Sequence, residues 1–192
     1  MKTKLMMIGV ALLFVLATSA SASGTDYMQE MINACTVNDT DAGTAAQQAR
    51  DEKIDHHELS YPKISFEELH LLSKIVQSEA GSNWISDEQQ RLVASVLMNR
   101  VNSPEFPSTV YDVVYQPNQY TGVNSQRFAN LKPTERAVQN TLYILENGSI
   151  LPASVVFQSN FKQGSGVHQS IYDETLGVWS YFCYSSRPNL YS

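Results

Sequence analysis

The chain has 192 residues, of which 43% are hydrophobic and 17% are charged, and its formal net charge is −6. This composition is typical of a globular protein and argues against an intrinsically disordered one. Residues 63–192 carry eleven acidic and nine basic residues, a balance that argues against a nucleic-acid partner.

Residues 1–22 have the pattern of a secretory signal peptide. Lys2 and Lys4 precede an apolar run over residues 5–17, and the small residues 20–22 offer a cleavage site before Ser23. An uncleaved membrane anchor is the alternative, although the run is short for a span. We therefore predict a secreted or cell-envelope protein with no stable membrane span after cleavage.

Residues 23–62 predict an acidic, polar linker or arm, either a tether or a partly helical segment. His56 and His57 lie in this segment, where solvated histidines are a simpler explanation than a metal site. The chain has two cysteines, Cys35 and Cys183. One disulfide is possible after export, but geometry decides whether the two pair.

The folded domain is predicted over residues 63–192, and its first helix begins at a capping box. Ser65 and Glu68 form the S-x-x-E pattern, and Gly81 is a residue that commonly ends helices. Apolar residues recur between these positions at helical spacing: Phe66, Leu69, Leu72, Ile75 and Val76. Glu79 follows Val76 by three positions, so the spacing predicts that it shares the buried side of this helix.

A carboxylate at that position has chemical consequences. Apolar neighbours favour its protonated form, and the negative end of the helix dipole acts in the same direction. Both effects raise the pKa of Glu79, as a general acid requires near neutral pH. The alternative is an ordinary solvated glutamate at a frayed helix end.

Three further helices are predicted by their caps. Ser86 and Gln89 begin a helix that ends near Val101, and Thr109 and Asp112 begin a short helix that ends near residue 115. A third helix begins at Pro133 and Thr134 and ends at residues 147–148. Between the last two, residues 115–128 predict a loop whose amides and aromatic rings suit a carbohydrate; a plain surface loop is the alternative.

The pattern changes to strands near the end of the chain. Residues 155–159 and 178–184 are rich in β-branched and aromatic residues, which favours two strands. Residues 163–168 between them predict a Gly-rich turn, where His168 either contacts substrate or lies on the surface. Helices followed by a small antiparallel ribbon give an α+β fold class.

Several segments together resemble the SleB-like cell-wall hydrolase family. The pair Glu79-Ala80 is followed by a helix that ends in Leu-Met-Asn-Arg-Val, then by Ser-Pro-Glu-Phe-Pro at residues 103–107 and Gln-Pro-Asn-Gln-Tyr at residues 116–120. The resemblance implies a lysozyme-like or lytic-transglycosylase-like catalytic domain that cleaves the bond from N-acetylmuramic acid to N-acetylglucosamine in peptidoglycan glycan strands. Family members commonly continue from Glu-Ala into Arg-Gly-Glu, and residues 81–83 of this chain depart from that pattern.

The resemblance also implies site residues. Glu79 matches the catalytic acid, and no cofactor and no metal are expected. Gln116, Gln119 and Tyr120 match positions in the glycan groove. Phe157, Gln158 and Tyr181 fall where the family has aromatic strands near the cleft.

The reaction is left open between three possibilities. No second catalytic carboxylate is obvious, which favours a lytic transglycosylase with one Glu as acid and then base over a hydrolytic muramidase. A secreted non-catalytic peptidoglycan-binding protein is the alternative from another class. A zinc amidase is disfavoured because no H-E-x-x-H motif occurs. The choice between spore cortex and vegetative wall, and the oligomeric state, are not determined by the sequence.

Overall fold

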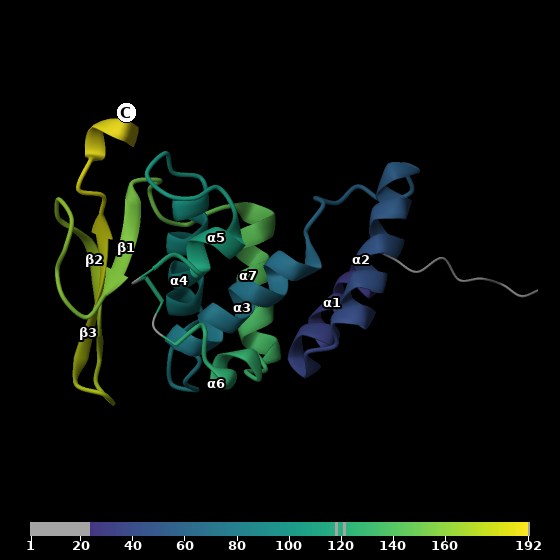
Figure 1. Cartoon of the computed structure of the whole chain (residues 1–192), viewed down its shortest axis with the longest axis horizontal. Coiled ribbons are helices and arrows are strands. Elements are labelled where there is room, and N and C mark those ends of the chain that lie inside the picture. Colours follow the sequence, from purple (N-terminus) through teal and green to yellow (C-terminus); the bar gives the residue numbers. More distant parts are fainter. Residues whose placement is uncertain (1–23, 118, 121, 192) are drawn as a thin grey trace, which may run out of the picture.

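The computed structural model describes residues 24–117, 119–120 and 122–191, so the predicted signal peptide lies outside the described residues. The described part is helical at one end and has a small sheet at the other (Figure 1). Its elements are α1 Gly24–Val37, α2 Thr40–Asp55, α3 Phe66–Ala80, α4 Asp87–Val101, α5 Val110–Val114, α6 Gln126–Ala129, α7 Glu135–Asn147, β1 Val155–Ser159, β2 Val167–Asp173, β3 Val178–Tyr184 and the 3-10 helix η1 Pro188–Tyr191. The α+β fold class is confirmed, with the small antiparallel sheet expected of a lysozyme-like domain.

Helices α3 and α4 begin where their capping residues predict. The Ser65 hydroxyl accepts a hydrogen bond from the Glu68 backbone N–H at 3.4 Å, and the Ser86 hydroxyl accepts one from the Gln89 N–H at 3.1 Å. Each bond satisfies a backbone donor that the first helical turn leaves without a partner. The caps therefore fix where both helices start, and with them the short turn between the helices.

Helix α3 is the central element of the helical part. Leu72 and Ile75 lie in one apolar cluster with α4 and α5, whereas Val76 and Ala80 lie in a second cluster with α4 and α7. All four residues are almost fully buried. Because α3 is packed along most of its length, the position of its last turn is set by the core.

The sheet is antiparallel, with strand order β1-β3-β2. One face packs on α4, where Phe182 and Ile171 contact a cluster with Leu92 and Val96. Strands β1 and β3 were predicted, but β2 was not: the expected Gly-rich turn ends at Gly166, and Val167 already pairs with β3. The polar composition of β2 does not predict a strand. Its hydrogen bonds to β3 stabilise it instead.

Helices α1 and α2 form the segment that the sequence predicts as a linker or arm. They form a helical hairpin that packs on α3. Met31 and Ile32 of α1 are buried in one apolar cluster with Phe66 and Leu69 of α3. The Arg50 side chain is fully buried and donates to the Ile64 carbonyl at 2.6 Å. The segment is therefore an ordered part of the described fold, although the boundary at residues 62–63 stays a prediction.

The two cysteines are free and buried, so the possible disulfide is not formed. Cys35 lies on α1 and Cys183 on β3, at opposite ends of the molecule in Figure 1. Burial raises the pKa of the Cys35 thiol to about 12. Separately, no helix within the described ranges combines the length and the apolar character needed to cross a membrane.

Candidate active site

Glu79 lies in the last turn of α3, and hydrogen bonds hold this end of the helix in place. The Gln90 side chain of α4 donates to the Ala80 carbonyl at 2.9 Å, and the Gln77 side chain donates to the Gly81 carbonyl at 3.3 Å. These bonds satisfy carbonyl groups that a helix C-terminus leaves without intrahelical partners. The backbone that carries Glu79 is therefore positioned from two sides.

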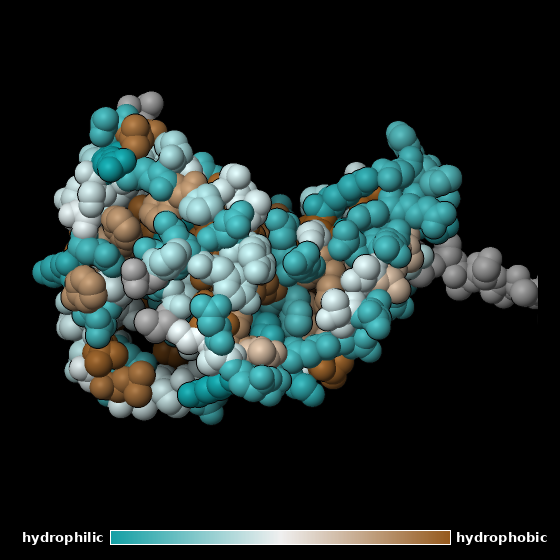
Figure 2. Space-filling view, in the orientation of Figure 1, coloured by the Kyte–Doolittle hydropathy of each residue, from teal (hydrophilic) through white to brown (hydrophobic). Residues whose placement is uncertain are grey.

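Glu79 faces a hollow of about 640 Å³. Its walls come from three parts of the chain: the end of α3 with the following turn, the segment around α6, and the tip of the β2–β3 hairpin. The lining residues are Gln77, Ser78, Glu79, Gly81, Ser82, Gly122, Ser125, Arg127, Phe128, Leu131 and Leu176. Figure 2 shows this face of the molecule hollowed between the hairpin and the helical part, at the lower left. Glu79 is the one carboxylate and Arg127 the one guanidinium among the residues that line the hollow.

The expected burial of Glu79 on the core side of α3 is wrong. Its side chain is exposed, because it points into the hollow instead of the apolar clusters. The walls of the hollow nevertheless remove enough water for desolvation to raise the pKa of Glu79. The predicted direction of the pKa shift thus agrees with the structure. The carboxyl group is also accessible to solvent, so a substrate can reach it.

Arg100 acts against this rise. Its positive charge lowers the pKa of Glu79, although desolvation is the larger effect. Tyr120 is within reach of both groups: burial raises its pKa, Arg100 lowers it and Glu79 raises it. Glu79, Arg100 and Tyr120 therefore form one electrostatically coupled group beside the hollow.

Arg100 is a residue that our sequence reasoning did not propose for the site. It is buried near the end of α4, where its Nε donates to the Val156 carbonyl at 2.6 Å and its Cζ lies 5.2 Å from the centre of the Phe106 ring. The one feature of the sequence that points to Arg100 is its place in the Asn-Arg-Val end of the helix, which is part of the family pattern.

None of the other expected site residues lines the hollow. Gln116 is half-buried and its Oε1 has no hydrogen-bond partner among the described residues, whereas Gln119 is exposed and its backbone N–H donates to the Gln116 carbonyl at 3.3 Å. Phe157 contacts Phe106 edge to face at 6.4 Å, which connects it to Arg100 through one ring. Gln158, also half-buried, pairs with Phe182 across β1 and β3.

Tyr181 also lies outside the hollow of Glu79. It lines a separate hollow of about 250 Å³ with Lys162, Val167, Ser170 and Trp179. Of the expected site residues, the structure thus groups Tyr120 with Glu79, connects Phe157 indirectly, and places Tyr181 at a different surface.

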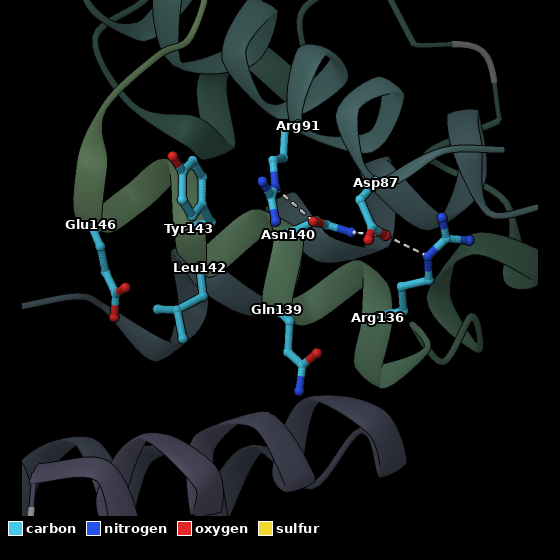
Figure 3. A pocket seen from close by; sticks show the side chains of 8 residues that line it. All are labelled: Asp87, Arg91, Arg136, Gln139, Asn140, Leu142, Tyr143 and Glu146. Atoms are coloured by element: carbon cyan, nitrogen blue, oxygen red, sulfur yellow. Dashed lines mark hydrogen bonds and ion pairs between the residues drawn. The ribbon is translucent and has the colours of Figure 1, made fainter.

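A third hollow, of about 310 Å³, lies between α4 and α7 and faces α1 (Figure 3). Four of its polar side chains bond in pairs: Arg91 donates to Asn140 at 2.8 Å, and Arg136 donates to Asp87 at 2.6 Å. None of the expected site residues lines it. Its network links α4 to α7 and so stabilises the helices that carry the site.

The histidines do not gather into a metal site. Among the described residues, no three His, Cys, Asp or Glu side chains lie close enough together to hold a metal ion. His70 bonds with Asn38 at 2.8 Å, and His168 bonds with the Tyr184 hydroxyl at 2.8 Å. His168 lies on β2, outside the hollow of Glu79.

Comparison with known protein families gives a match. Residues 85–174 match the model of the cell wall hydrolase family, over just under half of the chain. The match includes Arg100, Tyr120 and Arg127, and it begins six residues after Glu79. Searches of curated proteins and of solved structures found no match.

Proposed function

Because residues 85–174 of this chain belong to the SleB-like cell wall hydrolase family, we propose that the protein cleaves peptidoglycan glycan strands with Glu79 as the catalytic acid. One observation carries the proposal for Glu79: a carboxyl group with a raised pKa lies at the wall of a solvent-accessible hollow. A raised pKa increases the fraction of Glu79 that carries a proton as the pH approaches neutrality, and only this protonated form can donate. The protein then acts at the cell envelope.

The bond cleaved is the one from N-acetylmuramic acid to N-acetylglucosamine, and the reaction is a lytic transglycosylation. Glu79 protonates the glycosidic oxygen as the bond to C1 breaks. The resulting Glu79 carboxylate takes the proton from the muramoyl 6-hydroxyl, whose oxygen attacks C1 and forms a 1,6-anhydro product. One residue thus serves as acid and then as base, and no water is consumed.

The set of lining residues supports this reaction over a hydrolytic one. Glycosidases that use two carboxylates place the second one about 5–10 Å from the first. No second carboxylate lines the hollow among the described residues. Asp173, on the hairpin that carries Leu176, is occupied: it accepts bonds from the Trp84 indole and from the backbone of residues 175 and 176.

Arg100 assists Glu79 without replacing it. The Arg100 charge stabilises the carboxylate that forms after the first proton transfer, because it lowers the pKa of Glu79. The hydroxyl groups of Ser78, Ser82 and Ser125 and the amide of Gln77 offer hydrogen-bonding groups to sugar hydroxyls along the hollow.

Product analysis tests the proposal. Purified peptidoglycan is digested with the wild-type protein and with Glu79→Gln, and the products are identified by mass spectrometry. We expect anhydro-muramoyl ends with the wild type and no new ends with Glu79→Gln. Glu67→Gln, at an exposed position of the same helix, is the matched control and keeps full activity.

Two other outcomes have distinct meanings. Reducing muramic ends would exclude the transglycosylase reaction and identify a hydrolytic muramidase. Binding of peptidoglycan without cleavage by the wild type would identify a non-catalytic binding protein, for which the departure of residues 81–83 from the family pattern is the supporting observation.

A further inference from the structure

Three aromatic side chains form a continuous strip on the outer face of the sheet. Tyr172 and Trp179 are cross-strand partners whose ring centres lie 5.1 Å apart, and Trp179 stacks on Tyr181 at 6.0 Å. Residues 170, 172, 179 and 181 share one face, because side chains alternate along a strand. The opposite face, with Ile171 and Phe182, packs on α4. The aromatic strip therefore points away from the helices.

Two side chains of the aromatic strip are more exposed than packing in the fold would require. Tyr172 is 47% exposed and Trp179 is 45% exposed, although large aromatic side chains contribute most to stability when they are buried. Contiguous exposed apolar surface on a soluble domain often marks a binding site. The aromatic strip is thus a candidate surface for a ligand that covers ring faces.

Polar groups flank the aromatic strip. Lys162 holds its ammonium group 5.8 Å from the centre of the Tyr181 ring, and Ser170 pairs with Tyr181 across the strands. Together with Trp179 they line a shallow hollow of about 250 Å³. Ring faces with a hydroxyl and an ammonium donor at their edge suit a sugar, whose ring offers an apolar face and whose hydroxyls accept hydrogen bonds. The cation also complements the carboxylates of an acidic polymer such as peptidoglycan.

The hairpin that carries the aromatic strip also reaches the Glu79 hollow. Tyr172 is followed directly by Asp173, which accepts a hydrogen bond from the Trp84 indole at 3.0 Å, in the turn after α3. Leu176, at the tip of the same hairpin, lines the hollow itself. One hairpin thus carries the strip along its strands and contributes to the hollow at its tip.

We propose that Tyr172, Trp179 and Tyr181, with Lys162 and Ser170 at their edge, form a second binding site for the glycan strand of peptidoglycan, outside the hollow of Glu79. The site holds the insoluble polymer by stacking sugar rings on the aromatic strip, and so keeps the hollow close to its substrate. This inference rests on the proposed function for the identity of the polymer.

The first test measures binding without cleavage. Trp179→Ala and Tyr172→Ala are made in a Glu79→Gln background, and each full-length protein is co-sedimented with insoluble peptidoglycan. We expect each substitution to weaken binding roughly three- to tenfold, the effect of one aromatic contact. Trp179→Phe keeps a ring and should restore most of the binding. Tyr111→Ala is the matched control, since Tyr111 is 56% exposed on α5, outside the strip, and should bind like the parent protein.

The second test compares two substrates with Glu79 present. Trp179→Ala should lower the rate on insoluble peptidoglycan by the same factor, and should leave the rate on short soluble glycan fragments unchanged. Equal binding by Trp179→Ala and its parent, with circular dichroism showing both folded, would overturn the inference. Binding that is weakened by Trp179→Ala while the wild type cleaves nothing would leave the second site standing and overturn the proposed function instead. Loss of binding to anionic lipid vesicles alone would assign the strip to a membrane surface and also overturn the inference.

Discussion

The guanidinium of Arg100 lies over the ring of Tyr120, with its Nη1 donating to the Tyr120 hydroxyl at 3.5 Å and its Cζ 5.5 Å from the ring centre. The same charge opposes the rise in the pKa of Glu79 that desolvation causes. Arg100 is buried, so water screens this effect less than it would at the surface. Two opposing effects therefore set the pH range in which Glu79 stays protonated: desolvation raises its pKa, and the positive charge of Arg100 lowers it.

Replacing Arg100 tests this balance. A general acid must carry its proton, so activity falls as the pH rises through the pKa of Glu79. Arg100→Gln removes the charge that lowers this pKa, and the alkaline limb of the profile should move to higher pH. The amide keeps a donor for the Val156 carbonyl. The measurement is kcat/KM against pH on soluble glycan fragments. Arg91→Gln, in the hollow between α4 and α7, should leave the limb in place, and an unmoved limb in Arg100→Gln would contradict the coupling.

Glu79 should also make the stability of the protein depend on pH. Its folded-state pKa is raised, so its protonation favours the folded state, and this contribution is lost as the pH rises through the folded pKa. Glu79→Gln carries no charge and should therefore have the higher Tm at about pH 8. The difference should vanish below about pH 4, under the unfolded-state pKa of a glutamate. Calorimetry of both proteins across this range checks the sign, and a lower Tm for Glu79→Gln at alkaline pH would refute it.

Gly81 is predicted to be needed for the position of Glu79. A Cβ atom at residue 81 would lie 2.1 Å from the Gln77 carbonyl oxygen, closer than real contacts allow. Gln77 also accepts hydrogen bonds from the backbone N–H and hydroxyl of Thr134. Gly81→Ala should lower the free energy of unfolding by about 1–3 kcal/mol, as overpacking does, and should reduce activity by shifting the end of α3.

Urea unfolding measures the stability of Gly81→Ala, with Ser82→Ala in the same turn as the control. A Gly81→Ala protein as stable and active as the wild type would show that the helix end tolerates a side chain there.

Substituting Gly43 tests whether α1 and α2 form a packed hairpin or a loosely attached arm. A Cβ atom at residue 43 would lie 2.1 Å from the Phe66 ring, so Gly43→Ala should push α2 away from α3 and cost about 1–3 kcal/mol of unfolding free energy. In a solvated helix the same change would stabilise by up to about 1 kcal/mol. The sign of the change in denaturant midpoint therefore separates the two descriptions. Ala45→Gly, at an exposed position of α2, is the control for helix propensity.

Local patterns predicted the elements whose signals lie within one or two helical turns. The boxes at Ser65 and Ser86 were found as expected, and so was the end of α3 near Gly81. Helix α1 carries buried residues at helical spacing, such as Met28, Met31 and Ile32, but the polar composition of its segment outweighed them. Strand β2 exists through its bonds to β3, which no local pattern contains.

The hollow could not be predicted from any single segment of the sequence, because its walls come from separate parts of the chain. The helix pattern placed Glu79 at the end of α3, but it could not show which side of that end stays open. Gly122 and Leu176 reach the same hollow from 43 and 97 positions farther along the chain. Arg100 becomes relevant only because α4 packs beside α3. Tertiary packing therefore decided the burial of Glu79, where the local pattern gave the wrong answer.

Neither Cys35 nor Cys183 reaches the surface, and the helical body separates them (Figure 1). A covalent bond between the two sulfur atoms would require Cα atoms within about 7 Å, a distance that elements at opposite ends of the molecule do not provide. The folded chain thus needs neither an oxidant nor a disulfide isomerase. Its melting temperature should be the same in dithiothreitol and in air, so reducing agents can be left in or out of every assay described above.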